Sequence, residues 1–213
     1  MPLDRRLTQA LPLILIALLA AVLLWLVFIW DPAPPTPGSH AALGLTGTPA
    51  GGEFRLHGPD GPVSLTDLRG QVVLLYFGYA TCPDVCPTNL ALIALALRSL
   101  EPAEAAAVQP VFVSVDPERD TPARLAAFTS AFHPRILGLT GSPAEIAAAA
   151  AAYGAAYQRT EQPGSALGYV IDHSAYTYLI DPTGRLVATL DHATPAEQIR
   201  TQLRELLPSL PAD

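Results

Sequence analysis

The sequence predicts a three-layer α/β domain with a mixed sheet, placed behind a single N-terminal transmembrane helix. Two observations carry this prediction. From about residue 52 onward, short apolar segments typical of buried strands alternate with helical patterns, and the chain then ends in a hairpin pattern and a last helix. Before that region, residues 10–30 form one long apolar run. The alternation favours parallel strands, and the hairpin adds antiparallel ones.

The expected elements are spread along the whole domain. Strands are predicted at Phe54–Leu56, Val63–Leu65, Val72–Tyr79, Val111–Val115, Ile136–Leu139, Ser174–Ile180 and Arg185–Leu190. Helices are predicted at Pro87–Leu100 and after the cap residues Thr121, Ser142 and Thr194, each of which is followed by proline. Glu145 and Glu197 are placed to complete capping boxes at the last two of these helices.

The apolar run Ala10–Trp30 contains no charged residue. At about 1.5 Å rise per residue, its length matches the roughly 30 Å hydrocarbon core of a bilayer. Trp25 and Trp30 fall toward its end, where indole rings favour the membrane interface. A cleaved signal peptide is the alternative, but its apolar region would be shorter and would end in small residues. We therefore expect an uncleaved transmembrane anchor.

Flanking charges predict the orientation of that anchor. Arg5 and Arg6 precede it and Asp31 comes directly after it, so the positive-inside tendency leaves residues 1–9 in the cytoplasm and exports the chain beyond the anchor. The chain begins almost directly with its anchor and lacks an Arg- and Ser-rich transit segment. We therefore expect a single-pass protein of the inner (cytoplasmic) membrane, with its domain facing the periplasm or the cell exterior.

Two further segments lie beyond the anchor. Residues 31–51 are rich in proline, which favours an extended, semi-rigid spacer. Residues 52–213 then form the predicted globular domain.

The formal net charge of the chain is −7, and nucleic acid binding rests on clustered Lys and Arg. Nucleic acid is therefore not an expected partner.

The two cysteines lie between a predicted buried strand and a predicted helix, in FGYATCPDVCPTNL. Sites assemble at such a strand end in α/β sheets. Pro87 fits the first helical position, which places Cys86 near the N-cap and Cys82 in the preceding loop. The positive end of the helix dipole should lower the pKa of both thiols and favour thiolate, the form that binds metals and exchanges disulfides.

Two thiolates this close can converge on one soft ion, and sulfur ligands select Cu(I) or zinc over hard cations. Among the five histidines, His173 leads into a strand expected near the cysteine loop. An imidazole added to two thiolates would accept Cu(I) and tolerate Cu(II). Structural zinc usually takes four protein ligands, so a set of three disfavours zinc.

Other interpretations of the same residues stay open at this point. Cys82 and Cys86 also fit a simple disulfide or a redox-active dithiol of thioredoxin type. Taken alone, His173 fits a hydrogen-bonded structural histidine. The spacing between the cysteines is one residue longer than the Cys-x-x-Cys of thioredoxins, and together with His173 this favours metal binding.

Four separated blocks carry a family resemblance: YFGYATCPDVCP, VSVDPERDTP, FHPRILGLTG and VIDHSAYTYLIDPTGRL. In these blocks, their order and their intervals, the chain resembles the Sco/SenC family of copper-binding cytochrome c oxidase assembly factors. The resemblance implies a thioredoxin-like fold, with a mixed central sheet flanked by helices. It also implies that Cys82, Cys86 and His173 bind one copper ion, as Cu(I) or Cu(II), and that Asp172 influences metal binding or partner docking.

The resemblance implies a copper metallochaperone rather than an enzyme. Such a protein delivers copper to, or prepares, the dinuclear copper centre of cytochrome c oxidase subunit II, and other periplasmic copper carriers are further expected partners. The alternative comes from another class, a membrane-anchored thiol-disulfide oxidoreductase that reduces the copper-ligand cysteines of the oxidase. That reaction needs Cys82 and Cys86 but not His173.

Overall fold

A computed structural model describes residues 15–25 and 44–207 of the chain. The chain divides into two compact units, Met1–Gly38 and Ser39–Asp213. In the first unit residues 15–25 are helical and exposed, inside the run predicted to be an anchor. Within the described ranges, no helix combines the length and the apolar character needed to cross a membrane. Both ends of the predicted anchor, the predicted cytoplasmic N-terminus and most of the predicted linker lie outside the described residues.

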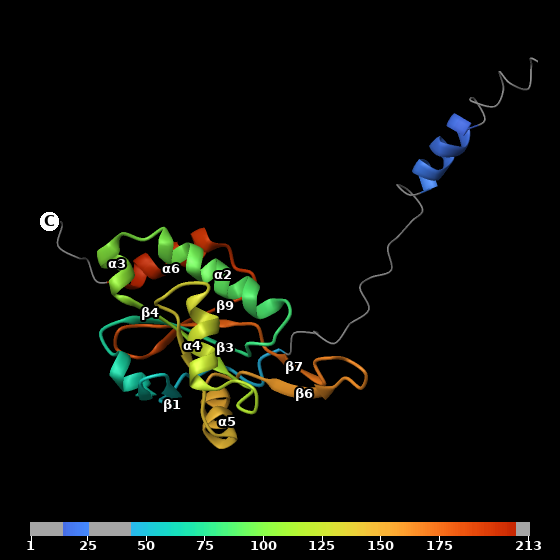
Figure 1. Ribbon diagram of the computed structural model, residues 1–213. Helices are drawn as coiled ribbons and strands as arrows, with labels where there is room; N and C mark the ends of the chain where they lie inside the picture. Colours follow the sequence, from blue (N-terminus) through green and yellow to red (C-terminus); the bar gives the residue numbers. More distant parts are fainter. Residues whose placement is uncertain (1–14, 26–43, 208–213) are drawn as a thin grey trace, which may run out of the picture. The chain divides into compact units, whose positions relative to one another are not determined.

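A five-stranded mixed sheet in the order β5-β4-β3-β8-β9 forms the centre of the second unit (Figure 1). Its strands are β3 (Val72–Gly78), β4 (Val108–Ser114), β5 (Leu137–Leu139), β8 (Thr177–Ile180) and β9 (Leu186–Leu190). β3, β4 and β5 are parallel, whereas β8 and β9 pair antiparallel. β3 is buried at every residue, because it is the middle strand. The predicted mixed α/β sheet is thus confirmed.

Helices cover both faces of this sheet. α2 (Val85–Arg98) and α6 (Ala196–Leu206) lie side by side over one face (Figure 1). Their apolar side chains pack on alternate residues of β3 in a cluster that includes Val72, Leu74, Ile93, Leu97, Ile199 and Leu203. α5 (Pro143–Ala152) lies toward the opposite face, where the next residue, Tyr153, packs against Phe77 and Tyr178. These three layers agree with the predicted architecture.

Several local predictions are also confirmed. β1 (Arg55–Gly58) and β2 (Gly61–Ser64) overlap the two short strands predicted there, and the structure adds that they pair antiparallel. Thr121 caps α4 (Pro122–Ser130) by accepting a hydrogen bond from the backbone of Arg124, and Ser142 forms the predicted capping box of α5 with Glu145. A 3-10 turn, η1 (Leu65–Leu68), and a short helix, α3 (Pro102–Ala106), were not predicted.

Two helix starts differ from the prediction. α2 begins two residues earlier than expected, with Asp84 as its N-cap, so Pro87 occupies the third helical position. Proline is tolerated there because the first four N–H groups of a helix have no intrahelical acceptor. At α6 the N-cap is Pro195, and Thr194 donates its hydroxyl to the Asp191 carbonyl over 2.8 Å instead of capping the helix. The predicted second capping box therefore does not form.

A hairpin outside the central sheet was not predicted. β6 (Tyr157–Glu161) and β7 (Tyr169–His173) pair antiparallel as a two-stranded sheet of their own. The strand predicted at Ser174–Ile180 is accordingly shorter and begins at Thr177 as β8. β6 is polar and half exposed, so it lacks the apolar pattern that marks a buried strand. His173 consequently ends a strand instead of preceding one.

Candidate metal centre

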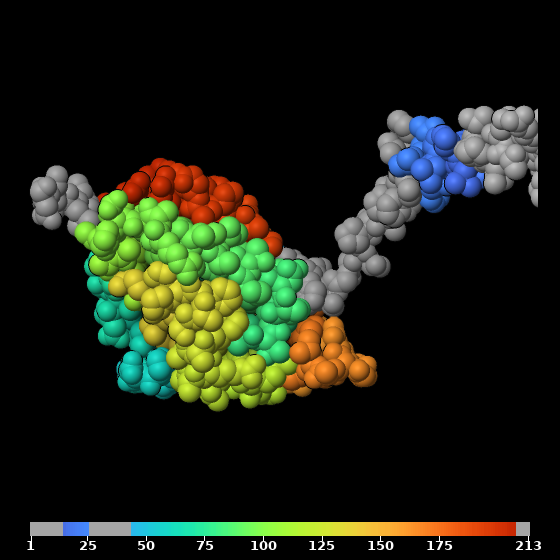
Figure 2. All heavy atoms as spheres, turned by 45° about the horizontal axis from the view of Figure 1, so that its top comes forward, coloured from blue at the N-terminus to red at the C-terminus, as the bar shows by residue number. Residues whose placement is uncertain are grey.

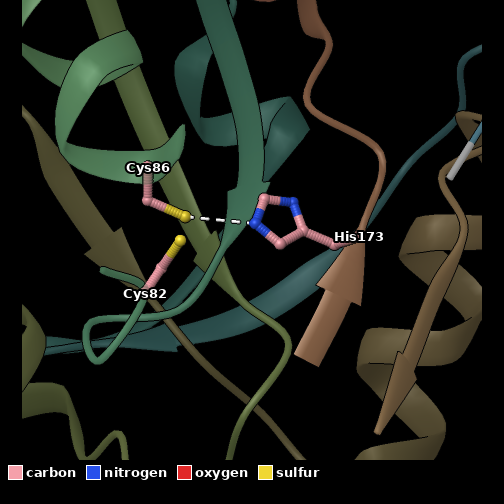
Figure 3. A group of neighbouring side chains, drawn as sticks. All are labelled: Cys82, Cys86 and His173. Carbon is pink, nitrogen blue, oxygen red and sulfur yellow. Dashed lines mark hydrogen bonds between the residues drawn. The ribbon is translucent and has the colours of Figure 1, made fainter. Parts of the chain in front are cut away.

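Cys82, Cys86 and His173 come together in one buried cluster (Figure 3). One possible ligand atom from each residue lies within 4.8 Å of the other two. Their exposed fractions are 7 % for Cys82, 0 % for Cys86 and 4 % for His173. The structure therefore brings together all three side chains proposed as ligands, from segments 87 residues apart in the sequence.

The two cysteines reach this cluster from adjoining elements. Cys82 lies in the loop after β3, and Cys86 lies in the first turn of α2. Both are free thiols in this structure. Gly78, the last residue of β3, leaves the room they need, because a Cβ atom added there would lie 2.6 Å from the Cys86 Sγ. A close approach of strand and helix thus brings the second sulfur to the site.

The backbone around His173 fixes the orientation of its ring. Nε2 lies 3.2 Å from the Cys86 Sγ, and Nδ1 lies 3.0 Å from the carbonyl oxygen of Ser174. A carbonyl can only accept, so this contact assigns the proton to Nδ1 and leaves the lone pair of Nε2 facing the sulfurs. Metal-binding histidines typically hold their second nitrogen in this way.

Two tyrosine rings wall the cluster. Tyr79 and Tyr76 meet the His173 ring edge-on, with centroid separations of 5.9 and 6.1 Å. The Tyr76 hydroxyl lies 4.0 Å from the Cys86 Sγ. Both tyrosines are almost completely buried, so the cluster lies in an environment of low polarity where charge interactions are strong.

The two thiols differ in acidity. Hydrogen bonding from Cys86 lowers the pKa of Cys82, and contacts to nearby backbone groups lower it further. Burial raises the pKa of Cys86. The hydrogen bond to Cys82 and the negative charge of the Cys82 thiolate raise it further. The expectation that the helix dipole lowers both pKa values is therefore wrong for Cys86, because full burial beside a thiolate outweighs the dipole.

The donor set discriminates among metal ions. Two sulfurs and one imidazole suit a soft ion such as Cu(I), whereas hard cations prefer oxygen ligands, which this group does not contain. Three donors also fall one short of the closed tetrahedral set typical of structural zinc. A cation between the sulfurs would remove the repulsion that opposes ionisation of Cys86. The residues thus fit a copper ion.

Asp172 stands apart from the cluster. Its carboxylate accepts a hydrogen bond from the Thr160 hydroxyl at 2.8 Å, across the β6–β7 hairpin. Two other histidines also have their own surroundings: His57 lies 3.8 Å from Glu145, and the His133 ring accepts the Arg135 backbone N–H. These contacts leave Cys82, Cys86 and His173 as the group assembled for a metal within the described ranges.

Asp120 and Asn89 support the cluster, and sequence reasoning gave neither a role. The buried Asp120 carboxylate accepts the Ala80 backbone N–H at 2.8 Å. The Asn89 side chain donates to the Ala175 carbonyl at 3.0 Å and accepts the Ala193 N–H at 2.9 Å. The signal for Asp120 was available, because an acidic residue shortly after a buried parallel strand lies at the same sheet edge as the cysteine loop.

The fold and the cluster together define a thioredoxin-like α/β domain with a buried Cys₂His site for a soft metal. The family model described as SCO1/SenC matches residues 44–208. The chain therefore belongs to the SCO1/SenC family, as its sequence blocks predicted.

Curated relatives agree with this assignment. The mitochondrial SCO2 homologue of Bos taurus is 42 % identical over 155 residues, which cover 72 % of this chain and 58 % of that protein. The mitochondrial SCO1 homologue 1 of Arabidopsis thaliana is 43 % identical over 133 residues, which cover 62 % of this chain and 39 % of that protein. The chain thus spans about half the length of these relatives.

Solved structures match the fold over nearly their whole length. ScoI of Bradyrhizobium japonicum, solved with copper bound, has a TM-score of 0.67 and 39 % identity, covering 74 % of this chain and 99 % of that one. Apo Sco1 of Thermus thermophilus has a TM-score of 0.68 and 40 % identity, covering 80 % of this chain and 99 % of that one. The predicted thioredoxin-like fold with a mixed sheet is therefore confirmed for this family member.

Proposed function

We propose that this protein is a copper metallochaperone that holds one copper ion through Cys82, Cys86 and His173. The observation that carries the proposal is the convergence of two buried sulfurs with the free Nε2 of an imidazole whose Nδ1 is fixed by a carbonyl. The copper bound to the similar ScoI of Bradyrhizobium japonicum supports copper as the cargo.

The recipient in this proposal is the dinuclear copper centre of cytochrome c oxidase subunit II, with other periplasmic copper carriers as further partners. Residues 10–30 anchor the protein in the inner membrane, residues 1–9 face the cytoplasm, and the domain from residue 52 faces the periplasm or the cell exterior. The uncharged apolar run and the exposed apolar side chains of its helical part, such as Leu15 and Leu19, support this placement. A membrane anchor would keep the cargo near a membrane-bound oxidase.

Transfer in this proposal is an exchange of ligands. An acceptor thiolate or imidazole reaches the ion, forms a mixed-ligand intermediate and draws the ion away as the ligands of this chain let go. The charge of the ion does not change, so no oxidant or reductant is consumed. Cys82 is the more exposed of the two cysteine residues, and we assign it to the side from which the acceptor enters.

The second candidate is a thiol-disulfide oxidoreductase, favoured by the unequal acidity of the two thiols. A thiol with a lowered pKa, such as Cys82, is suited to attack a disulfide as thiolate. It would form a mixed disulfide, which Cys86 would resolve, giving a Cys82–Cys86 disulfide while the substrate takes up two electrons and becomes a dithiol. His173 has no part in this chemistry, so it separates the two candidates.

Copper binding by the full-length protein in detergent tests the proposal. The wild type and His173→Ala are loaded anaerobically with Cu(I), and separately with Cu(II), with the exposed His192→Ala as a matched control. We expect tight one-to-one binding by the wild type and the control. In His173→Ala we expect at least a roughly 100-fold loss of affinity, because loss of a supporting residue alone typically costs about 10- to 100-fold.

Two other outcomes would change the assignment. Unchanged affinity in His173→Ala would contradict the three-ligand site. If the wild type bound no copper yet readily reduced a model disulfide, the oxidoreductase would replace the metallochaperone.

A further inference from the structure

One loop contacts both halves of the metal cluster. This loop, residues 115–121, joins β4 to α4 and is called the β4–α4 loop below. Through Asp120 it reaches the segment that carries Cys82, and through Arg119 it reaches the hairpin that carries His173. The hairpin forms its own two-stranded sheet, and Figure 2 shows that it projects from one side of the domain (orange). Its position therefore depends on contacts outside the central sheet.

Asp120 holds the turn that presents Cys82. Its side chain is completely buried, and it accepts the Ala80 N–H at 2.8 Å and the Ser114 hydroxyl at 2.7 Å. The turn is closed by a hydrogen bond from the Cys82 N–H to the Tyr79 carbonyl at 3.1 Å. Ala80 lies between Tyr79 and Cys82 in this turn. By fixing Ala80, the Asp120 carboxylate therefore determines where the Cys82 sulfur lies.

Arg119 holds the hairpin at the start of β7. Its guanidinium donates to the carbonyls of Leu167 and Tyr169 at 3.2 and 3.1 Å and lies 3.7 Å from the centroid of the Tyr169 ring. It also pairs with Asp116, whose carboxylate accepts the Tyr169 hydroxyl at 2.7 Å. Tyr169 and His173 lie on the same face of β7, four residues apart. Fixing Tyr169 thus aligns the strand that ends in the imidazole.

The same arginine also touches the ring that walls the site. The Arg119 guanidinium carbon lies 5.7 Å from the centroid of the Tyr79 ring, which meets the His173 ring edge-on. Two consecutive residues of the β4–α4 loop therefore contact the two sides of the cluster: Asp120 contacts the segment that carries Cys82, and Arg119 contacts the hairpin that carries His173.

We propose that Asp120 and Arg119 are positioning residues that set the separation between the Cys82 sulfur and the His173 imidazole. The inference rests on the proposed copper-carrier function. Asp120 acts through Cys82, and Arg119 acts through His173. The β4–α4 loop thereby determines how tightly the three ligands close on the ion and how fast they release it.

Matched variants of the full-length protein separate positioning from stability. Asp120→Asn is paired with Asp181→Asn, another buried aspartate that accepts backbone N–H groups, those of Thr183 and Arg185. Arg119→Gln is paired with Arg135→Gln, whose guanidinium also donates to two backbone carbonyls, those of Ala106 and Val108, at the far end of β4 from the cysteine loop. Each control removes the same kind of contact away from the cluster.

Copper affinity and the Cu(II)–thiolate absorption band are the main readouts. We expect a loss of at least about tenfold in affinity and a shifted band for Asp120→Asn and Arg119→Gln, as is typical of residues that orient metal ligands. The controls should stay within twofold of the wild type even where their melting temperature falls. Tyr169→Phe, which deletes only the hydroxyl and its contacts with Asp116 and Glu118, repeats the histidine-side test if Arg119→Gln folds poorly.

Double variants and a measurement on the metal-free protein test which ligand each residue positions. In the His173→Ala background, Arg119→Gln should cause no further loss of the residual copper affinity, whereas Asp120→Asn should. In the apo protein, Asp120→Asn should change the alkylation rate of Cys82 severalfold, and Arg119→Gln should not.

The outcomes also distinguish failure of this inference from failure of the proposed copper-carrier function on which it rests. If the wild type binds copper but each variant behaves like its matched control, the positioning roles are overturned and the carrier function stands. A full effect of Arg119→Gln in the His173→Ala background would overturn its assignment to the histidine. If the wild type binds no copper, both the inference and the proposed function fail.

Discussion

At the scale of single residues, steric room at the end of β3 is as important to the cluster as the ligands themselves. Gly78 faces the Cys86 sulfur, the Phe112 ring and the Tyr76 ring, which an added Cβ would meet at 2.6, 2.9 and 3.1 Å. The first and second distances lie well inside van der Waals contact, and all three neighbours are buried. A methyl group at this position would therefore displace the sulfur, a ring or the strand.

Gly78→Ala should consequently damage both stability and metal binding. We expect a loss of about 1–3 kcal/mol in the free energy of unfolding, because overpacking a tight core typically costs that much, together with a clear fall in copper affinity. Urea denaturation and copper titration measure the two effects. Gly47→Ala is the control, since an added Cβ there meets nothing within 4 Å. Equal behaviour of the two variants would contradict the tight approach of β3 and α2.

The same scale shows how much of the site could be predicted from the sequence. Cys82, Cys86 and His173 were identified because their residue types carry metal chemistry and their sequence blocks resemble a known family. Asp120 was missed although its position shortly after a buried parallel strand was a usable signal. Arg119 was missed because its role depends on contacts with residues 48 and 50 positions away in the sequence. Local spacing carries no information about such contacts. The acidity of Cys86 was mispredicted for a similar reason, since its burial beside Cys82 outweighs the helix dipole.

At the scale of elements, the turn between β8 and β9 is organised by one aspartate. Burial alone would raise the pKa of Asp181, but hydrogen bonds from Thr183 and Arg185 outweigh it and lower the pKa from its ordinary 3.8 to about 2. The sequence Asp-Pro-Thr-Gly predicted this turn because its residue types define turn geometry locally. The β6–β7 hairpin has no such signal: β6 is polar and half exposed, so only its pairing with β7 identifies it.

The Asp181 turn predicts a specific acid sensitivity. Because the folded state has the lower pKa, Asp181 stabilises the protein above its unfolded pKa, and that contribution is lost as the pH falls from about 4 toward 2. Asp181→Asn should lower the free energy of unfolding by about 1–2 kcal/mol at pH 7 and should flatten its fall between pH 4 and 2. Urea unfolding at several pH values measures both. If Asp181→Asn kept the full acid sensitivity of the wild type, the loss of stability between pH 4 and 2 would come from other carboxylates.

At the scale of the whole molecule, the fold places a site that is closed to solvent at the edge where two independently paired sheets meet. The central sheet and α2 supply the sulfurs, and the separate hairpin supplies the imidazole. A carrier must release its cargo, and a buried ligand set can do so only if one of its parts moves. A dithiol reductant has no need of the hairpin's histidine. The histidine is therefore the part of this architecture that the proposed carrier uses and the alternative oxidoreductase does not.

Oxidase assembly in cells distinguishes the two functions. A strain lacking this protein is complemented with the wild type, His173→Ala, Cys82→Ser, Cys86→Ser or the exposed control His192→Ala. For a copper carrier, each of the three ligand variants should fail to restore oxidase activity, while the control succeeds. For a dithiol reductant, His173→Ala should still restore it, because the thiols remain able to exchange disulfides. Restoration by either single cysteine variant would contradict both mechanisms, since each of them requires both sulfurs.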